Sequence, residues 1–543
     1  MTSLEPDLVL VNGRMSGAAG EEGSRRALAV SGGRIVALGS DEEIRPLIGT
    51  TTRVLDVRGA RVIPGLIDSH IHAVRAGATW TERLDWSGMT SLADALASIT
   101  ERAARLPEGS WILVVGGWHP GRFSERRGPT MAELTAAAPR HPVFVQLLYE
   151  EAWVNQAGLD ALGMRAGTRD PDGGTFERRA DGSPTGSLRG RGAFGLCLGA
   201  ADDPPFETKV AASGRFFREL NALGLTGALD TGGLGMTPEA YRPLHELWRR
   251  RALTLKVRLF LGPSTPGDEL AQIRDFVRYL HPGFGDELLR LVGVGEIPVF
   301  ACWDGEGVHP FEVVAPAKRL LEEIVRLLVQ HGWTLHQHAI LDSTVADTLD
   351  VWEKVDADMP IAPRRFAFAH AEPVGDENLQ RIKALGAGIA VQDRMLFRAA
   401  DSATLWGEET LRRAPPLRRI LDLGIPLGAG TDATAVSPYN PWWSLWWLVT
   451  GRSLDGAPPR SPEHRLSRSE ALAAYTSGSA WFSHDEHQRG TLAPGMAADL
   501  AVLSDDYFTI DEDAIPSLRS VLTLVDGKIT HADPDLDVKG TEE

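Results

Sequence analysis

The sequence predicts an α/β protein, a (β/α)₈ TIM barrel with a small β-sandwich domain built from both chain termini. Through the middle of the chain, short apolar runs alternate with amphipathic helical stretches, as βα units around a parallel sheet do. The two ends of the chain instead consist of short β-type runs separated by Gly turns. No GxGxxG opens the first βα turn, which disfavours a nucleotide-binding doubly wound sheet.

The two ends resemble each other, and each is too short to bury a core alone. DLVLVNGRM, ALAVSGGRIVALG and TRVLDVRGARVIPG near the start carry the NG and GG pairs typical of hairpins. GTLAPGMAADLAVLSDD and SVLTLVDGKITHA near the other end have the same character. We expect residues 1–62 and 483–543 to pair into one composite β-sandwich domain, with the barrel at 63–482 inserted between them.

The middle of the chain supplies the candidate barrel strands. They are WILVVGG, HPVFVQLLY, TLKVRLFLG, LLRLVGVGEI, WTLHQHAIL, RFAFAHAE, GAGIAVQD and IPLGAGTD. Between several of them lie stretches with apolar residues at helical spacing, such as AKRLLEEIVRLLVQHG. The segment at about 120–215 is rich in Gly, Pro, Arg and Asp and breaks this alternation, so we predict an insertion there over the active-site mouth.

Composition and charge exclude several classes of protein. The formal net charge of −17 argues against nucleic acid or an anionic membrane as a partner, because both bind clustered Lys and Arg. The two cysteines, Cys197 and Cys302, are too few for a disulfide framework or a thiolate zinc site. The sequence shows no targeting segment and no apolar run of membrane-spanning length, so we expect a soluble cytoplasmic protein.

Histidines gather at the ends of several predicted strands. In VIPGLIDSHIH, His70 and His72 are two residues apart in a strand and therefore point to the same side. Others follow later strands: His336 and His338 in WTLHQHAIL, His370 in RFAFAHAE, and Asp432 in PLGAGTD. Each alone could be a solvated histidine or a turn cap. Together, at the catalytic edge of a barrel, they predict a site for Zn²⁺ or a similar divalent ion.

The chain resembles the amidohydrolase superfamily, in its YtcJ-like or amidohydrolase family 3 branch. The matching stretches, from about residue 6 to 530, are VIPGLIDSHIH, AWVNQAGLDALG, DPDGGTFERRADGSPTGSL, HAILDSTV, FAHAEPVGDENLQRIKALGAGIAVQ, GIPLGAGTDATAVSPYNPW, EALAAYTSGSA and GTLAPGMAADLAVL. The resemblance implies a metal-bearing barrel, with His70 and His72 as first-strand ligands. His338 and His370 match the fifth- and sixth-strand histidines, and Asp432 matches the eighth-strand aspartate, which handles the proton of the attacking water.

The sequence departs from this family at several positions. Gly295 stands where many relatives carry a metal-bridging lysine, and Glu296 follows it. Either the site holds one metal, or Glu296 supplies the missing carboxylate. An offset of one residue normally turns a side chain to the other face of a strand, so one ion is favoured. Relatives also often carry a His where this chain has Glu150 and a Glu where it has Ala369, which predicts a different substrate pocket.

The predicted function is metal-assisted hydrolysis of a C–N bond in an amide, N-acyl or N-formyl compound. The ligand candidates are His70, His72, His338, His370, Asp432 and Glu296. A metal ion lowers the pKa of its bound water toward ~7. Asp432 is predicted to take the proton of that water and pass it to the leaving nitrogen. His338 or His370 is predicted to polarise the carbonyl.

Substrate contacts are predicted from the aromatic content. The chain has 15 tryptophans, which suggests a cavity for a bulky or aromatic substrate, although the NPWWSLWWL run is better explained as helix packing. Trp118 is the candidate pocket wall, with Arg122 and Glu150 as polar contacts. The alternatives are a deaminase or lactonase on the same scaffold, or an inactive barrel acting as a binding protein. A small-molecule substrate is expected, and the resemblance is compatible with a homodimer.

Overall fold

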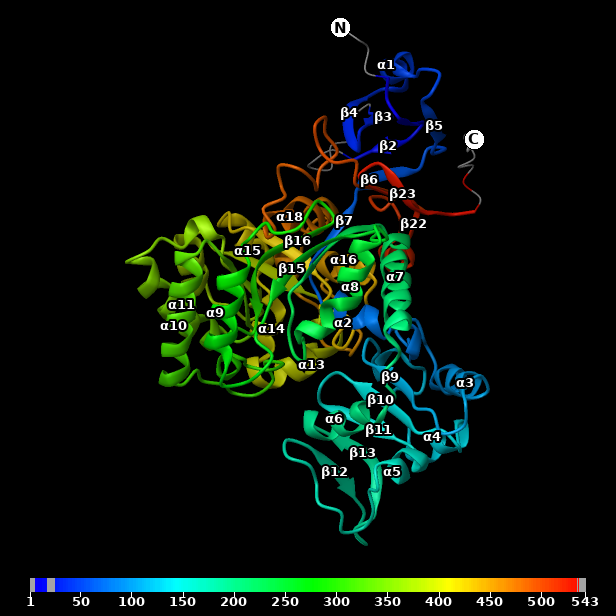
Figure 1. Ribbon diagram of the computed structural model, residues 1–543, viewed down its shortest axis with the longest axis vertical. Coiled ribbons are helices and arrows are strands. Elements are labelled where there is room, and N and C mark those ends of the chain that lie inside the picture. The colour runs from blue at the N-terminus through cyan, green and yellow to red at the C-terminus, as the bar shows by residue number, and fades with distance from the viewer. Residues whose placement is uncertain (1–4, 17–24, 535, 537–543) are drawn as a thin grey trace.

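The computed structural model describes residues 5–16, 25–534 and 536. Its centre is a sheet of eight parallel strands, and the predicted barrel is therefore confirmed (Figure 1). In sheet order the strands are β7 (Leu66–Ile71), β14 (Leu225–Asp230), β15 (Lys256–Leu261), β16 (Leu289–Glu296), β17 (Thr334–Ala339), β18 (Ala367–His370), β19 (Gly388–Gln392) and β20 (Leu427–Gly430).

The first and last strands meet at their carboxyl ends, which brings the sheet close to a closed barrel. Asp432 N, just after β20, donates to His70 O at 2.8 Å. The buried carboxylate of Asp68 in β7 accepts from Thr431 Oγ1 at 2.7 Å and from the Thr431 backbone N. These hydrogen bonds hold the end of the eighth strand against the first-strand histidines and require no metal ion.

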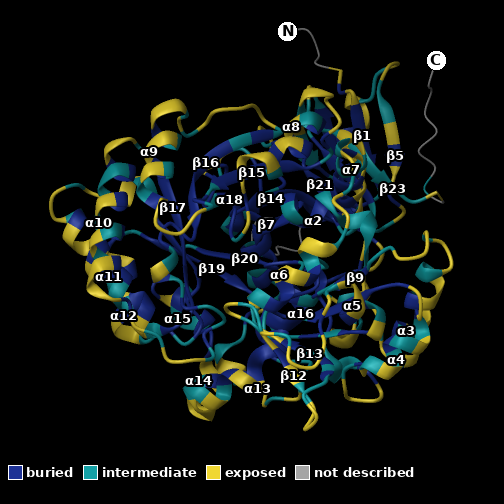
Figure 2. Ribbon diagram, turned by 60° about the horizontal axis from the view of Figure 1, so that its bottom comes forward, coloured by how far each residue is buried: buried dark blue, intermediate teal, exposed yellow. Residues whose placement is uncertain are grey.

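Helices cover the outside of the barrel, as the alternating pattern predicts. They include α7 (Phe206–Ala222), α8 (Arg242–Arg249), α9 (Glu269–Tyr279), α10 (Ala315–Gln330), α11 (Asp342–Asp356), α12 (Asp376–Ala384) and α15 (Leu417–Asp422). In α10 the buried side chains recur at helical spacing, with Leu321, Ile324, Val325 and Leu328 against the strands. Figure 2 shows the result, with buried strands inside and exposed outer helix faces. The NPWWSLWWL run forms α16 (Pro441–Thr450), and its tryptophans pack mainly into this helical layer.

A second, six-stranded sheet interrupts the barrel after its first strand. Its order is β12 (Thr175–Arg178), β13 (Pro184–Arg189), β11 (Glu151–Val154), β10 (Val143–Leu147), β9 (Ile112–Val115) and β8 (Arg83–Leu84), with helices α3 (Leu92–Ala103), α4 (Met131–Ala137), α5 (Gln156–Ala161) and α6 (Arg191–Ala200). Figure 1 shows this part in cyan, projecting from one end of the barrel.

Two of the predicted barrel strands were wrong. WILVVGG and HPVFVQLLY form β9 and β10 of the six-stranded sheet, where they pair in parallel. The second barrel strand is β14, which the sequence analysis did not identify. A parallel pair buried in any sheet gives the same apolar run, so the pattern could not tell the two sheets apart. The sheet also begins at Arg83, ahead of the insertion predicted at about 120–215.

Two further sheets lie at the opposite end of the barrel. One has the order β4 (Arg34–Gly39), β3 (Ala27–Ser31), β1 (Leu8–Val11), β5 (Arg53–Asp56). The other joins the two ends of the chain, with β2 (Arg14–Met15) and β6 (Arg61–Pro64) beside β21 (Leu500–Leu503), β22 (Ser520–Val525) and β23 (Lys528–Ala532). Figure 1 shows the red strands β22 and β23 against the blue N-terminal strands. The predicted domain limits at 62 and 483 stay a prediction.

Buried ion pairs fill the amino end of the barrel. Arg258 Nε donates to Asp485 Oδ2 at 2.7 Å, and Arg290 pairs with the other oxygen of the same carboxylate. Burial would raise the pKa of Asp485, but the surrounding arginines overcome that effect and lower it to about 2. Among the described residues, no helix is long and apolar enough to cross a membrane.

Candidate metal centre and active site

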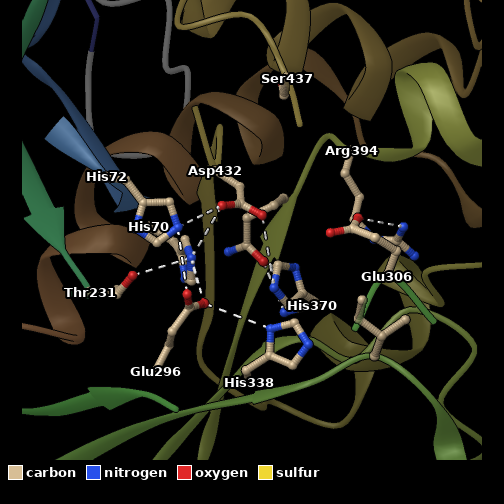
Figure 3. Close-up of polar contacts among 12 residues, drawn as sticks. His70, His72, Thr231, Glu296, Glu306, His338, His370, Arg394, Asp432 and Ser437 are labelled. Carbon is tan, nitrogen blue, oxygen red and sulfur yellow. Dashed lines mark hydrogen bonds and ion pairs between the residues drawn. The ribbon is translucent and has the colours of Figure 1, made fainter. Parts of the chain in front are cut away.

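Two histidines and two carboxylates converge at the carboxyl end of the barrel (Figure 3). His70 Nε2 lies 3.2 Å from Glu296 Oε2 and 3.6 Å from Asp432 Oδ1. His72 Nε2 lies 3.1 Å from Asp432 Oδ1 and 3.5 Å from Glu296 Oε1. All four side chains are largely buried. The strand-end rule therefore brought the first- and eighth-strand residues together as expected.

Glu296 reaches this cluster, contrary to the expectation that its offset turns it away. It is the last residue of β16, where the pleat no longer fixes the direction of the side chain. Gly295 has no side chain to compete with it, and a Cβ on Gly233 would come within 2.8 Å of Glu296 Oε1. Two glycines thus leave the space that this carboxylate occupies.

The fifth- and sixth-strand histidines complete the ring of ligand candidates. His338 Nδ1 lies 3.7 Å from Glu296 Oε2, and His370 Nε2 lies 4.0 Å from Asp432 Oδ2. His336, which the sequence left open, lies behind the cluster, with its Nε2 3.2 Å from His70 Nδ1. Burial lowers the pKa of His336 to about 3, so its imidazole is neutral.

Hydrogen bonds on the far sides of the imidazoles orient their inner nitrogens. His72 Nδ1–H donates to Gly232 O at 2.9 Å, which leaves Nε2 as the acceptor facing Asp432. His338 Nε2–H donates to Asp304 Oδ1 at 2.9 Å and leaves Nδ1 facing Glu296. Metal-binding histidines are held in this way. Asp304 was not identified from the sequence, because it lies in the loop after β16 rather than at a strand end.

The donor set fits a divalent cation. His70, His72 and Asp432 each offer one ligand atom, and these three atoms lie within 4.8 Å of one another. The same holds for one ligand atom each of His70, Glu296 and His370. Neutral imidazoles and carboxylates are the ligands that Zn²⁺ takes in hydrolases. The described residues thus include two overlapping groups of three that could hold a divalent ion.

The electrostatics of the cluster also favour a bound cation. Burial would lower the pKa of His70, but the charges of Glu296 and Asp432 raise it to about 10. Burial would raise the pKa of both carboxylates, yet the neighbouring imidazoles hold each well below its usual range. The paired carboxylates therefore attract positive charge strongly, whether it arrives as a proton or as a metal ion.

Three residues at the cluster have a strained backbone. His370, Ala371 and Asp432 have φ values of 75°, 45° and 56°, in the left-handed region that residues with side chains avoid. Such strain is usual where side chains are held for a purpose. Here it turns the sixth- and eighth-strand groups toward the cluster.

A cavity opens beside the cluster and is lined in part by His72, His338, Glu296 and Asp432. Its other walls come from Arg75, Tyr149, Leu234, Ile297, Trp303 and Glu306. The sequence analysis did not identify Arg75, Tyr149 or Glu306. For Arg75 a signal existed, because it follows the His70–His72 motif by one turn of helix α2 (Ala73–Ala78).

The three predicted substrate contacts lie elsewhere. Trp118 is buried in the six-stranded subdomain, where its Nε1 donates to Gln146 O at 2.8 Å. Arg122 lies 4.8 Å above the Trp443 ring and donates to Ser87 O. Glu150 forms an ion pair with Arg398 at 2.5 Å. None of the three lines the cavity. Trp118 follows β9, which is not a barrel strand, so the end of that strand does not mark the barrel mouth.

Comparison with known proteins supports the fold and the kind of site. A profile of the amidohydrolase family matches residues 53–531. The chain is 26% identical to N-substituted formamide deformylase of Arthrobacter pascens, over 97% of this chain and 98% of that protein. It is also 26% identical to the putative amidohydrolase YtcJ of Bacillus subtilis, over 94% and 97% of the two chains.

Solved structures show the same fold at lower identity. An uncharacterized metal-dependent hydrolase from Pyrococcus furiosus superposes with a TM-score of 0.66 at 23% identity, covering 92% of this chain and 100% of that one. A mutant of atrazine chlorohydrolase TrzN from Arthrobacter aurescens, complexed with zinc and atraton, has a TM-score of 0.53 at 18% identity, covering 97% and 95%.

Proposed function

The chain belongs to the amidohydrolase family, and from that premise we propose that it hydrolyses a C–N bond of an amide, N-acyl or N-formyl compound with the help of Zn²⁺. Membership makes it a metal-dependent hydrolase of small molecules. The choice of bond and of metal is our proposal. It rests on the convergence of His70, His72, Glu296 and Asp432, the last three of which line one cavity. Similarity to a formamide deformylase over 97% of the chain supports the C–N bond.

One ion would be held by His70, His72 and Asp432, with Glu296 adjacent. When bound, it would lower the pKa of a coordinated water from 15.7 toward ~7 and so make a nucleophile available at neutral pH. We favour a single ion, because Gly295 stands at the position of the bridging lysine expected in many relatives. The position of Glu296 between His70 and His338 leaves room for the two-ion alternative.

Asp432 is the proposed proton carrier. Its Oδ1 faces the two first-strand histidines, while its Oδ2 faces His370. During attack the water oxygen bonds to the carbonyl carbon, and Asp432 accepts the proton that the water releases. When the C–N bond breaks, Asp432 returns that proton to the leaving nitrogen, which departs as a neutral amine.

His338 is the proposed partner of the carbonyl oxygen. Asp304 holds its ring by the 2.9 Å hydrogen bond to Nε2 and stabilises the protonated form. Burial would lower the pKa of His338, but Asp304 and Glu296 raise it to about 10. A positively charged imidazole at this wall would stabilise negative charge as it develops on the substrate oxygen. His370, on the other side of Asp432, is the alternative for this role.

Two measurements test the proposal together. Elemental analysis of purified protein should find about one zinc per chain, whereas an inactive binding protein should come out without metal. The enzyme should then release amine and acid from N-formyl or N-acyl compounds, aromatic ones included. Ammonia release from ring amidines would instead identify a deaminase, and hydrolysis confined to lactones would identify a lactonase. Either result would contradict the proposed bond.

A further inference from the structure

Arg75 is a cation in the active-site cavity to which the proposed mechanism gives no task. It lies on α2, which begins directly after His72, and its side chain lines the same cavity as His72, Glu296 and Asp432. A substrate whose carbonyl reaches the metal cluster would therefore lie within reach of this guanidinium.

The hydrogen bonds of Arg75 go to neutral groups. Its Nη1 donates to Leu234 O at 3.0 Å and its Nη2 to Tyr149 Oη at 3.1 Å. Within the described part of the chain, no carboxylate forms an ion pair with it. Neighbouring buried arginines differ, since Arg394 pairs with Glu372 at 2.5 Å and Arg398 with Glu150 at 2.5 Å.

The other charged group on the cavity wall does not neutralise Arg75. Glu306 is 3.7 Å from Arg394 Nη1, so its charge is already shared with another arginine. Glu296 and Asp432 face histidines, and a bound metal ion would offset their charge further. No described carboxylate therefore contacts Arg75 directly, and Glu296 and Asp432 act on it only through their longer-range charge.

Arg75 is partly exposed, cannot lose its proton, and has no contacting counter-charge, so its guanidinium is available to an anion that enters the cavity. Its planar fork of donors matches a carboxylate in two parallel hydrogen bonds. We propose that Arg75, held in place by Tyr149, binds a carboxylate of the substrate. The substrate class is then N-formyl or N-acyl amino acids and related acids. This inference rests on the proposed function and narrows it.

The remaining walls suit the rest of such a molecule. Leu234, Ile297 and Trp303 offer apolar surface beside Arg75. The guanidinium of Arg191, from α6 of the six-stranded subdomain, lies 4.1 Å above the Trp303 ring and backs this wall. Such apolar walls beside a few polar groups are typical of small-molecule sites and would contact an apolar side chain of the substrate.

The test compares two substrates that differ by one group. N-formylphenylalanine carries the carboxylate, and N-formylphenethylamine lacks it. Wild-type enzyme should prefer the acid by about 10- to 100-fold in kcat/KM, the range of one charge-assisted contact. In Arg75→Met the ratio should fall to about one. Arg468→Met is the matched control, because this arginine also donates to neutral oxygens, Tyr507 O and Ile510 O, and does not line the cavity, so its ratio should stay at the wild-type value.

Three results would overturn the inference while leaving the hydrolase intact. The first is a wild-type enzyme that cleaves both compounds equally well. The second is an Arg75→Met variant that loses activity equally on both, which would place Arg75 at the shared carbonyl. The third is an unchanged ratio in Arg75→Gln, which removes the charge but keeps hydrogen-bond donors, and which also serves if the Met variant fails to fold.

Failure of the proposed function gives a different pattern. If metal-loaded wild-type protein cleaves neither compound, the proposed hydrolysis of a C–N bond is wrong. The role of Arg75 is then tested by ligand binding alone. Titration calorimetry with N-formylphenylalanine should then show a Kd at least about 10-fold weaker for Arg75→Met than for wild type. Equal Kd values, or binding to neither protein, would refute the carboxylate subsite.

Discussion

Glu296 Oε2 lies 3.2 Å from His70 Nε2, so the carboxylate that follows Gly295 faces the first-strand histidine pair. The fourth strand therefore contributes a ligand candidate without the lysine that many relatives use there. The negative charge of Glu296 helps to make the cluster a cation site, and replacing it changes charge with little change in shape.

Glu296→Gln should weaken metal binding by about 10- to 100-fold, as loss of a group beside a metal typically does. Zinc retained per chain after dialysis should fall, and activity with it, with partial recovery in excess zinc. Glu150→Gln is the control, since Glu150 pairs with Arg398 outside the cavity. Wild-type zinc content in Glu296→Gln would show that Glu296 holds no metal. A stoichiometry near two in wild type would show a second ion.

Asp432→Asn should lower kcat by about 10²- to 10⁴-fold, because the amide cannot accept the proton of the attacking water. The fold should persist, since Asp432 N rather than its side chain bonds to His70 O. Circular dichroism and zinc content, measured alongside turnover, separate loss of proton transfer from loss of metal. Near-wild-type turnover would show that Asp432 does not accept the proton of the attacking water.

Trp118 should matter for stability and not for substrate choice. Trp118→Ala removes a buried ring stacked 5.3 Å from Phe123 and should destabilise the protein by about 3–5 kcal/mol, measured by denaturant unfolding. Trp118→Phe and Arg122→Met should leave KM within about 2-fold of wild type, because neither residue lines the cavity. A large change in KM for Trp118→Phe would show that Trp118 does contribute to substrate binding.

Asp485 should make stability sensitive to acid. Its pKa is about 2 in the folded protein, below the ordinary value of 3.8, so the folded state favours the charged form. The resulting stability is present above about pH 4 and is lost as the pH falls from 3.8 toward 2. Thermal unfolding at graded pH should show this loss.

Asp485→Asn should unfold more easily at neutral pH, since Arg258 loses its partner, and should lose less stability on acidification than wild type. Identical pH profiles for the two proteins would refute the assignment.

The sequence predicted those parts of the site that local rules determine. His70 and His72 share a strand face, and strand ends in a barrel meet at one edge, so their convergence with His338, His370 and Asp432 followed from position alone. The alternation of side chains along a strand did not predict the direction of Glu296, because Glu296 is the last residue of its strand. Trp118 lies away from the cavity because β9 resembles a barrel strand in sequence but pairs in another sheet.

Asp304 and Glu306 could not be found in the same way, and Arg75 had only its position one helical turn after the histidine pair to mark it. Each lies in a loop or at the start of a helix, and its neighbours in space come from distant segments. Asp304 acts through His338, and Arg75 meets Tyr149 from the six-stranded subdomain. Contacts of this kind depend on how a loop folds back, for which a single sequence carries no periodic signal.

The pairing of β6 with β21 can form only after most of the chain has been synthesised. Ile63 lies opposite Ala501 in that pair, and after Gly65 the chain passes directly from β6 into the histidine-bearing strand β7. While the ribosome is still translating the barrel, β6 has no neighbour on that edge, because β21 has not yet been synthesised. The strand that carries His70 and His72 is thus secured late in biosynthesis, and metal uptake should follow translation rather than accompany it.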